Sequence, residues 1–514
     1  MSQHMETRQP MHDRSSSQVL DYKAKTGIDG LDKILQGGLP GNRLYVLEGS
    51  PGSGKTTLAL QFLLEGIRNG ETVLYVTLSE TAEELYEVAR SHNWSLEGIH
   101  LLELDSLADR IREESDYTVY HPADVELVET TRRIREEVER IRPTRVALDS
   151  VSELKILSQT IARYRREILG FKQFFVGKRC TVMVLDDLTS AKNEQQLQSI
   201  AHGVIRMERD TRDYGTTRRQ LHVIKMRAVP FRDGLHDFVI RAGGIEVFPR
   251  LSTAEQSLAE PHADGTIQSG VKELDALLGD GLDRASSTLI LGPAGCGKTT
   301  IAGQFMFAAL ERGEPVLAYL FEERAATFLQ RAAGLGMNFK THLESGLLEL
   351  MQIDPAEVSP GEFASHIDRR VKSRGVRMVV IDSLNGYVNA MPNERFLLIQ
   401  MHELLTCLGQ MGVVTLLIMA QHGMMGTMGS MNAPVDVSFL ADTVILLRYF
   451  EAQGAIRQAI SIVKKRRGAH ERTIRELQLT QTGILVGEPL REFEGVLTGV
   501  PRYKGTQKPL LKEI

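Results

Sequence analysis

Two stretches of the chain carry the glycine, lysine and threonine spacing of a phosphate-binding loop. Residues 49–57 read GSPGSGKTT and residues 292–300 read GPAGCGKTT, and both fit G-x-x-x-x-G-K-[ST]. The glycines let backbone N–H groups turn inward around a polyphosphate at the positive end of a helix. Lys55 and Lys298 would then reach the β- and γ-phosphates. A glycine-rich turn is the alternative, but chance would place the four fixed residues in roughly one of ten thousand windows.

Both loops are therefore expected to bind ATP through their backbone and through a few side chains. The residues expected to contact the nucleotide are Gly49, Ser50, Pro51, Gly52, Ser53, Gly54, Lys55, Thr56 and Thr57 in the first loop, and Gly292, Gly295, Cys296, Gly297, Lys298, Thr299 and Thr300 in the second.

The surroundings of the two loops repeat with the same spacing. Lys298 minus Lys55 gives an offset of 243 residues, and this offset also matches Gln61-Phe62 with Gln304-Phe305. Upstream of the loops it pairs Gly27, Leu31, Asp32, Leu35, Gly38 and Leu39 with Gly270, Leu274, Asp275, Leu278, Gly281 and Leu282. The chain is therefore predicted to be a duplication of one nucleotide-binding domain.

An aspartate closes an apolar run downstream of each loop. Asp149 ends VALD and Asp382 ends VVID. At the end of a strand such a carboxylate can hold the Mg²⁺ shell beside the phosphates, together with the loop hydroxyls of Thr56 and Thr299. A strand-end turn is the alternative for an isolated aspartate, but a phosphate loop upstream in each repeat favours the metal. We expect ATP and Mg²⁺ as the ligands.

Glutamates follow the strand after each loop helix and are candidate catalytic bases. Hydrolysis or phosphoryl transfer needs a carboxylate that orients or deprotonates the attacking oxygen. The second repeat has Glu322 and Glu323 there, whereas the first has Ser79 and Glu80, so it lacks one carboxylate. Acidic residues also favour the first turn of a helix, and a capping pair is the alternative.

Two Lys-x-Arg pairs end strands that come late in each repeat, far from the loop of that repeat. The pairs are Lys225 with Arg227 and Lys464 with Arg466. Because side chains alternate along a strand, each pair shares one face. Such cations could enter the site of a neighbouring subunit and neutralise the γ-phosphate, which requires a ring of chains. Solvated strand ends are the alternative.

Strands that alternate with helices must position these residues, and they predict an α/β fold with two mostly parallel sheets flanked by helices. Ligands of such sheets lie at the carboxyl ends of the strands, where the acids above fall. The charged run 134–145 favours a solvated helix over a nucleic-acid contact. We expect a disordered tail at 1–20, a first domain at 21–247, a linker at 248–265, a second domain at 266–488 and an exposed tail at 489–514.

The expected strands are short apolar runs, and a helix follows each loop, at Lys55–Asn69 and Lys298–Arg312. The strands are Leu44–Leu47, Thr72–Leu78, Val146–Asp149, Thr181–Leu185 and His222–Arg227 in the first repeat, and Ser287–Leu291, Pro315–Leu320, Met378–Ile381, Val413–Met419, Thr443–Leu447 and Ala459–Val463 in the second.

Composition narrows the class of protein. The 514 residues include 42% hydrophobic and 25% charged residues, which is ordinary for a globular protein. A net charge of −5 gives no pull toward nucleic acid or an anionic membrane. Cys180, Cys296 and Cys407 are isolated, which argues against disulfide or zinc patterns. Without a signal peptide or membrane-spanning run, a cytoplasmic enzyme is expected.

These residues together resemble the KaiC family over roughly residues 20–500. The matching pieces are both loops, Glu322-Glu323, the Lys-x-Arg pairs, IDSL at 381–384, DTVILLRYFEAQG at 442–454 and HERTIREL at 470–477. The resemblance implies two tandem RecA-like P-loop NTPase domains and a two-tiered homohexamer, with ATP at the subunit interfaces. The first tier would hydrolyse ATP, and the second would phosphorylate its own serine or threonine residues.

The resemblance also assigns a phosphoacceptor. The family has an adjacent Ser-Thr pair shortly before a T-D-T-like segment, and here the register gives Ser438 followed by Phe439. One acceptor hydroxyl is thus kept and the other is absent. Clock timing by ordered double phosphorylation therefore fits less well than a KaiC-like signalling ATPase that binds protein partners.

Two rival functions share part of this pattern. A RecA- or RadA-type DNA-dependent ATPase has the same loop, but such chains usually carry one ATPase core and a separate DNA-binding module. An ATP-gated scaffold would bind signalling partners with little turnover. Slow hydrolysis combined with tight nucleotide-dependent assembly would favour the scaffold.

Overall fold

The structure is a computed structural model that describes residues 22–104, 122–188, 195–211, 215–251, 265–389, 394–421, 438–481, 483–497 and 501–505. It divides into two compact units, Met1–Arg250 and Leu251–Ile514. The expected tail at 1–20, most of the expected linker and residues 506–514 lie outside the described ranges.

The first unit is a mostly parallel sheet between two layers of helices. Its elements are β1 (Lys23–Ala24), α1 (Asp29–Ile34), β2 (Leu39–Pro40), β3 (Leu44–Gly49), α2 (Lys55–Arg68), β4 (Val73–Thr77), α3 (Ala82–Ser91), β5 (Ile99–Glu103), α5 (Pro122–Ile141), β6 (Arg145–Asp149), α6 (Val151–Leu157), α7 (Ile161–Gly177), β7 (Thr181–Asp187), α8 (Gln195–Ile200), β8 (Gly203–Asp210), β9 (Arg218–Met226), β10 (His236–Arg241) and β11 (Gly244–Phe248).

The second unit repeats this plan. Its elements are β12 (Thr266–Ile267), α9 (Lys272–Leu277), β13 (Leu282–Asp283), β14 (Ser287–Gly292), α10 (Lys298–Glu311), β15 (Val316–Leu320), α11 (Ala325–Ala333), α12 (Lys340–Glu344), β16 (Leu348–Gln352), α13 (Pro360–Arg374), β17 (Met378–Asp382), α14 (Leu384–Asn389), α15 (Glu394–Gln410), β18 (Val414–Ala420), β19 (Thr443–Ala452), β20 (Ala455–Lys465), β21 (Ile474–Thr480), β22 (Gly483–Pro489), β23 (Phe493–Glu494) and β24 (Arg502–Tyr503).

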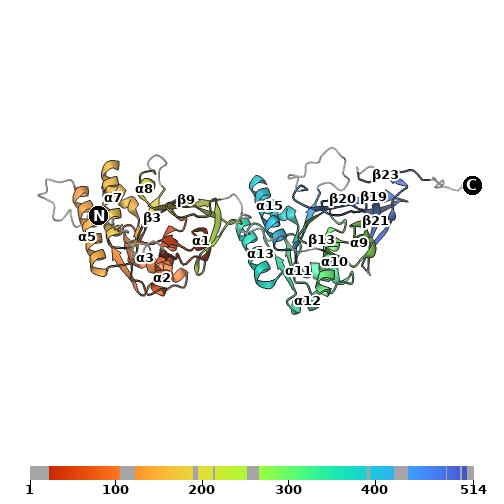
Figure 1. Ribbon diagram of the computed structural model, residues 1–514, viewed down its shortest axis with the longest axis horizontal. Coiled ribbons are helices and arrows are strands. Elements are labelled where there is room, and N and C mark those ends of the chain that lie inside the picture. Colours follow the sequence, from red (N-terminus) through yellow and green to blue (C-terminus); the bar gives the residue numbers. More distant parts are fainter. Residues whose placement is uncertain are drawn as a thin grey trace, which may run out of the picture. The chain divides into compact units, whose positions relative to one another are not determined.

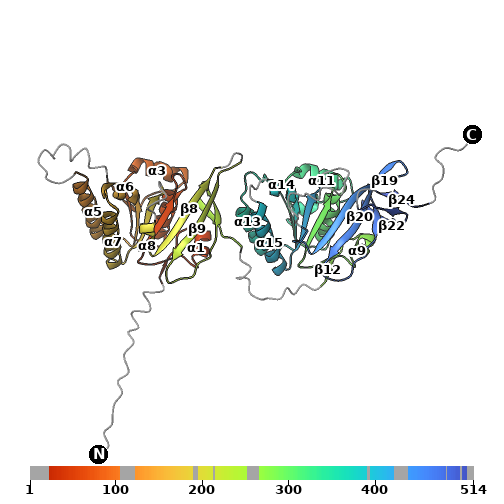
Figure 2. The same cartoon turned by 90° about the horizontal axis from the view of Figure 1, so that it is seen from above.

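The two main sheets have the same topology, which confirms the predicted α/β fold. Among the described residues each has nine strands, in the order β11-β10-β9-β8-β3-β7-β6-β4-β5 and β16-β15-β17-β18-β14-β19-β20-β21-β22. The strand before each loop is central and pairs in parallel with both of its neighbours. Next to these, β9 runs antiparallel to β8, and β20 runs antiparallel to β19. Figure 2 shows β8 beside β9, and β19 beside β20.

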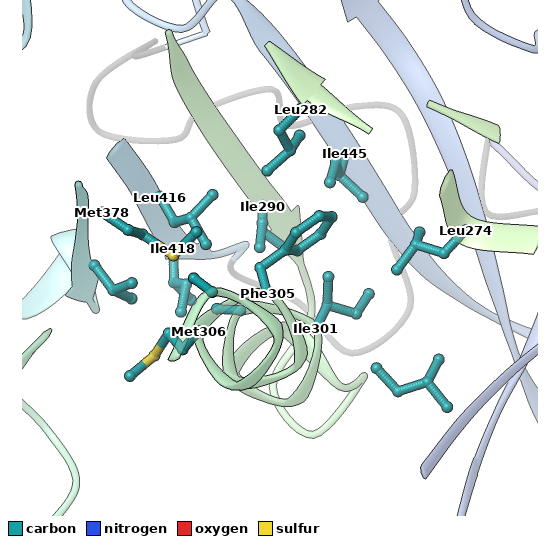
Figure 3. Packing of buried hydrophobic residues seen from close by; sticks show 14 of the residues in the cluster. Leu274, Leu282, Ile290, Ile301, Phe305, Met306, Met378, Leu416, Ile418 and Ile445 are labelled. Carbon is teal, nitrogen blue, oxygen red and sulfur yellow. The ribbon is translucent and has the colours of Figure 1, made fainter. Parts of the chain in front are cut away.

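Each sheet is covered on both faces because its strands are buried runs of apolar residues. In the first unit α1, α2 and α3 pack on one face and α5, α6 and α7 on the other, as Figure 1 shows for α2 against α5 and α7. In the second unit Phe305 of α10 lies beside Ile290 of β14, and Ile301 of the same helix belongs to the same buried cluster (Figure 3). The loop helix is thereby held rigidly against the central strand of its sheet.

The expectation of a solvated helix over the charged run 134–145 is wrong for the last residue of the run, Arg145. The helix α5 ends at Ile141, and Arg145 opens β6, an inner strand of the sheet. The Arg145 side chain is 1% exposed and pairs with Glu71 at 2.7 Å. It also donates hydrogen bonds to the carbonyls of Lys25 and Phe62 at 2.6 and 2.9 Å. A buried guanidinium is tolerated here because a carboxylate and two carbonyls satisfy its donors.

Part of the expected C-terminal tail is folded. The strands β23 and β24 form an antiparallel pair that joins Phe493 to Tyr503. Val496 is buried against Phe450, and the rings of Phe450 and Phe493 lie 5.3 Å apart. Burial of these apolar side chains ties the segment to the late strand β19. No helix in the described ranges is long and apolar enough to span a membrane.

Candidate nucleotide-binding sites

Each loop lies between the central strand and its helix, with glycines at the positions where only glycine fits. Gly54 and Gly297 cap their helices with φ of 106° and 97°, a conformation that other residues rarely adopt. A Cβ on Gly49 would meet the carbonyl oxygen of Met207 at 2.5 Å. Each glycine-rich loop therefore presents backbone N–H groups at the N-terminus of its helix, where an anionic phosphate fits.

The crest of each loop faces outward, and the residue before the last glycine of each loop is fully buried. Pro51 and Gly52 are exposed in the first loop. Ser53 and its counterpart Cys296 are 0% exposed, so they could contact a nucleotide only through their backbone. Burial raises the pKa of the Cys296 thiol, which keeps it protonated.

In the first repeat the loop lysine uses its three N–H donors within the protein. Lys55 Nζ donates to the carbonyls of Gly49 at 3.0 Å and Ser50 at 3.1 Å. Its third contact is the carboxylate of Asp187, at 2.7 Å. Asp187 ends β7, and its backbone lies opposite Gly49 in the sheet. No motif in the sequence assigns this acid to the site.

The loop threonine and the strand-end aspartate of the first repeat are in direct contact, as a shared metal site would require. The hydroxyl of Thr56 donates to Asp149 Oδ2 at 2.9 Å. A second donor, the hydroxyl of the buried Tyr75, reaches the same oxygen at 2.5 Å. Burial raises the pKa of Asp149, and the two hydrogen bonds and Lys55 oppose that rise. No motif in the sequence points to Tyr75.

Glu80 lies at the same edge of the sheet. Its backbone is held by Thr77, whose hydroxyl donates to Glu80 O at 2.6 Å and accepts from Glu80 N at 3.0 Å. Burial, followed by the negative charges of Asp149, Glu84 and Asp187, raises the pKa of Glu80 to about 7. Its buried Oε2 has no hydrogen-bond partner among the described residues. A carboxyl with a pKa near neutrality is suited to accept a proton from water.

The second repeat brings the same parts together. Lys298 Nζ donates to the carbonyl of Pro293 at 2.6 Å, and the Thr299 side chain lies near enough to Asp382 to lower the pKa of its carboxyl. Burial raises the pKa of Asp382 to about 6. Thr299 and Arg331 oppose this rise, whereas Glu323 and Glu322 add to it.

The two glutamates of this repeat have different partners. Ser383 donates to Glu322 Oε1 at 2.7 Å. Arg331, on α11, donates to both oxygens of Glu323, at 3.3 and 2.6 Å. Arg331 was not found from the sequence, since it stands eight residues beyond Glu323 with no motif around it. Both carboxylates therefore lie near Asp382, each oriented by a separate donor.

The Lys-x-Arg pair of the second repeat caps the turn that holds Ser438. Lys464 Nζ donates to the carbonyls of Ser438 at 3.0 Å and Ala441 at 2.7 Å. Arg466 donates to Phe439 O at 2.8 Å and Asp442 Oδ1 at 3.2 Å. Ser438 is half-buried, and Phe439 is exposed.

The equivalent pair of the first repeat makes the same kind of contact. Lys225 donates to Gln198 O at 2.5 Å and Arg227 to Ser199 O at 3.0 Å. Burial, followed by Arg227 and Lys172, lowers the pKa of Lys225. Gln198 thus stands where the second repeat has Ser438.

These cations lie at the sheet edge opposite their own phosphate loop. Lys464 is opposite Val444 in the sheet, and Val444 is opposite Leu289 in the first half of β14. The loop begins at the other end of that strand, at Gly292. The structure therefore brings the loops, the aspartates and the glutamates together, and it places the cations and Ser438 elsewhere. Within the described residues no three His, Cys, Asp or Glu side chains form a metal cluster.

Comparisons with known proteins agree with this architecture. A family model described as "ATPase: KaiC" matches residues 24–252 and again residues 267–491. The circadian clock oscillator protein KaiC of Thermostichus vulcanus is 28% identical over 508 residues, with 96% of this chain and 95% of that protein covered. The circadian clock protein KaiC3 of Synechocystis is 27% identical, with 94% and 95% covered. KaiC of Synechococcus elongatus is 27% identical, with 93% and 92% covered.

Proposed function

The chain belongs to the KaiC family of ATPases, and on that premise we propose an ATP-hydrolysing homohexamer whose second repeat phosphorylates Ser438. The first repeat hydrolyses ATP, and the second transfers the γ-phosphoryl group to a neighbouring chain. Relatives named as circadian clock proteins support a signalling role. Because Phe439 stands beside Ser438, a single acceptor hydroxyl is proposed rather than a pair.

Nucleotide binding is supported by the charge of each loop, which is complementary to that of a polyphosphate. The buried lysine, the helix N-terminus and the exposed loop crest of each repeat present positive charge to one point. Mg²⁺ held near Thr56 and Asp149, or near Thr299 and Asp382, would neutralise charge on the β- and γ-phosphate oxygens. The hydroxyl–carboxylate contact of each repeat keeps these ligands together.

In the first repeat Glu80 acts on water. Its carboxylate orients a water molecule and accepts its proton as the oxygen attacks the γ-phosphorus, while the bond to the β,γ-bridging oxygen breaks. The products are ADP and inorganic phosphate. Thr77 fixes the Glu80 backbone, so the carboxylate is presented at the carboxyl edge of the sheet.

In the second repeat the glutamate pair acts on a serine hydroxyl. Glu323, with Glu322 beside it, takes the proton of the Ser438 hydroxyl while its oxygen forms the bond to phosphorus, and ADP leaves. Lys464 and Arg466 donate to the backbone of the turn that holds Ser438. They would bring two positive charges to the transferred phosphoryl group.

One observation supports the assembly of the chains into a ring. Ser438, Lys464 and Arg466 cluster at the edge of the sheet opposite their own loop. Within one folded unit they cannot meet the phosphates that the loop holds. A second copy of the chain supplies the missing half of the site. In a closed ring, the edge of each copy that carries Ser438, Lys464 and Arg466 meets the phosphate loop of the next copy.

Labelling with [γ-³²P]ATP, followed by mapping of the labelled residue, tests this function. We expect label on Ser438 of the parent chain and none on Ser438→Ala or on the Glu322→Gln, Glu323→Gln double variant, with nucleotide binding kept. Full labelling of Ser438→Ala would place the acceptor elsewhere. An unlabelled parent chain would reduce the second repeat to an ATPase.

A further inference from the structure

The loop lysine of the first repeat is saturated by groups of its own chain. An ammonium group has three N–H donors. Lys55 directs them to two carbonyl oxygens and to the carboxylate of Asp187. A phosphate oxygen that binds Lys55 must therefore take the place of at least one of these acceptors. The carboxylate is the one that can leave, because its side chain is 29% exposed whereas the carbonyls belong to the loop backbone.

The second repeat has no such carboxylate. Asp187 lies opposite Gly49 between β3 and β7, and the residue opposite Gly292 between β14 and β18 is Ala420. Among the described residues, Lys298 forms no ion pair, and its amine donates to the carbonyl of Pro293. The two repeats thus differ in charge at one equivalent position beside the loop lysine.

Asp187 also adds negative charge to a site that already holds two acids. It acts electrostatically on both Glu80 and Asp149. When the carboxylate is displaced from Lys55 it remains next to the loop, because its backbone N–H donates to Ser152 Oγ at 3.0 Å and stays in the sheet. A polyphosphate in the first loop would therefore meet a like charge that the second loop lacks.

We propose that Asp187 is an internal counter-ion that competes with the nucleotide for Lys55. The carboxylate lowers the nucleotide affinity of the first repeat, and the second repeat has no such competitor. The inference rests on the proposed binding of nucleotide at the first loop and goes beyond it by assigning a residue that sets affinity. Mg²⁺ lowers the negative charge of the polyphosphate, so the competition is strongest for nucleotide without the metal.

Titration with the fluorescent nucleotide mant-ADP tests the assignment. In a Lys298→Ala chain, where the first site is measured, Asp187→Ala should tighten binding by roughly five- to tenfold in Mg²⁺, a common size for coupling between two ligands. The gain should be larger in EDTA. Asp187→Asn, which keeps the shape and removes the charge, should behave in the same way. A gain of affinity cannot arise from a chain that has failed to fold.

The reciprocal change supplies the matched control. In a Lys55→Ala chain, Ala420→Asp should weaken mant-ADP binding at the second site by a similar factor. The Ala420 backbone is held by Asn385, so the new side chain leaves those bonds in place. Unchanged or weaker binding in the Asp187 variants, with the parent site binding normally, would overturn the inference and leave the proposed function intact. Absence of binding in both parent and variant would contradict the inference and the proposed function together.

Discussion

Arg331 holds both carboxylate oxygens of Glu323, at 3.3 and 2.6 Å, and donates to the Thr300 hydroxyl at 3.5 Å. One side chain of α11 therefore connects the catalytic candidate to the end of the phosphate loop. The free rotation of the glutamate is removed, so its oxygens are aimed before the acceptor arrives. Arg331 acts through Glu323 and is a positioning residue in this account.

Loss of the glutamate pair should abolish phosphoryl transfer without loss of binding. The Glu322→Gln, Glu323→Gln variant removes the proton acceptor, and its rate of Ser438 labelling should fall by roughly 100- to 10,000-fold. Arg331→Ala should lower the rate less and should leave the mant-ADP affinity unchanged. Arg374→Ala, which removes an ion pair between the half-exposed Arg374 of α13 and Glu349 of β16, is the control. Parent rates in the double variant would show that another group is the base.

Each loop lysine should govern one class of nucleotide site. Lys55→Ala and Lys298→Ala remove a buried positive charge from one loop each, so each should release about half of the bound nucleotide. Equilibrium dialysis with labelled ADP measures the number bound per chain. An unchanged number in either variant would mean that the loop concerned is not a site.

Hydrolysis by the first repeat should depend on pH near neutrality. The pKa of Glu80 is raised to about 7, and a base must be deprotonated, so kcat/KM should rise as the pH rises through that value and then level off. Colorimetric phosphate release from the Lys298→Ala chain reports the first site. Because Asp187 adds to the elevation of this pKa, Asp187→Asn should move the rise to lower pH. A flat profile in the parent would exclude Glu80 as the base.

The buried ion pair of Arg145 should stabilise the first unit. Arg145→Ala leaves the Glu71 charge without its main partner and should lower the free energy of unfolding by about 3–5 kcal/mol. Arg140→Ala removes an arginine that is 67% exposed and should cost about 0–1 kcal/mol. Trp94 is the single tryptophan of the chain and lies in this unit, so its fluorescence during urea unfolding reports the result. Equal losses in the two variants would contradict the assignment.

The fold could be predicted from the sequence because its signals are local. The glycines and lysines at 49–57 and 292–300 demand a strand before them and a helix after them, and β3, α2, β14 and α10 take those places. The strand ends at Asp149 and Asp382 follow from short apolar runs. Thr56 meets Asp149 because the carboxyl ends of parallel strands share one edge of the sheet.

The missed residues depend on contacts between distant parts of the chain. The composition around Arg145 is that of a charged helix, but its guanidinium pairs with Glu71, which stands just before the neighbouring strand β4. Asp187 is far in sequence from Lys55, and Arg331 is one arginine of an ordinary helix. No local pattern indicates which carboxylate a long cationic side chain will pair with, because the packing of the sheet and its helices determines which carboxylate lies nearby.

The central claim is that each second-repeat site is completed by a neighbouring chain, and a mixing experiment tests it most directly. Ser438→Ala keeps the base and lacks the acceptor, whereas the Glu322→Gln, Glu323→Gln variant keeps the acceptor and lacks the base. The two chains, distinguished by a size tag, are incubated with [γ-³²P]ATP separately and then together. We predict that neither is labelled alone and that the mixture is labelled on Ser438 of the glutamate variant. A mixture without label, under conditions where the parent chain is labelled, would contradict transfer between chains.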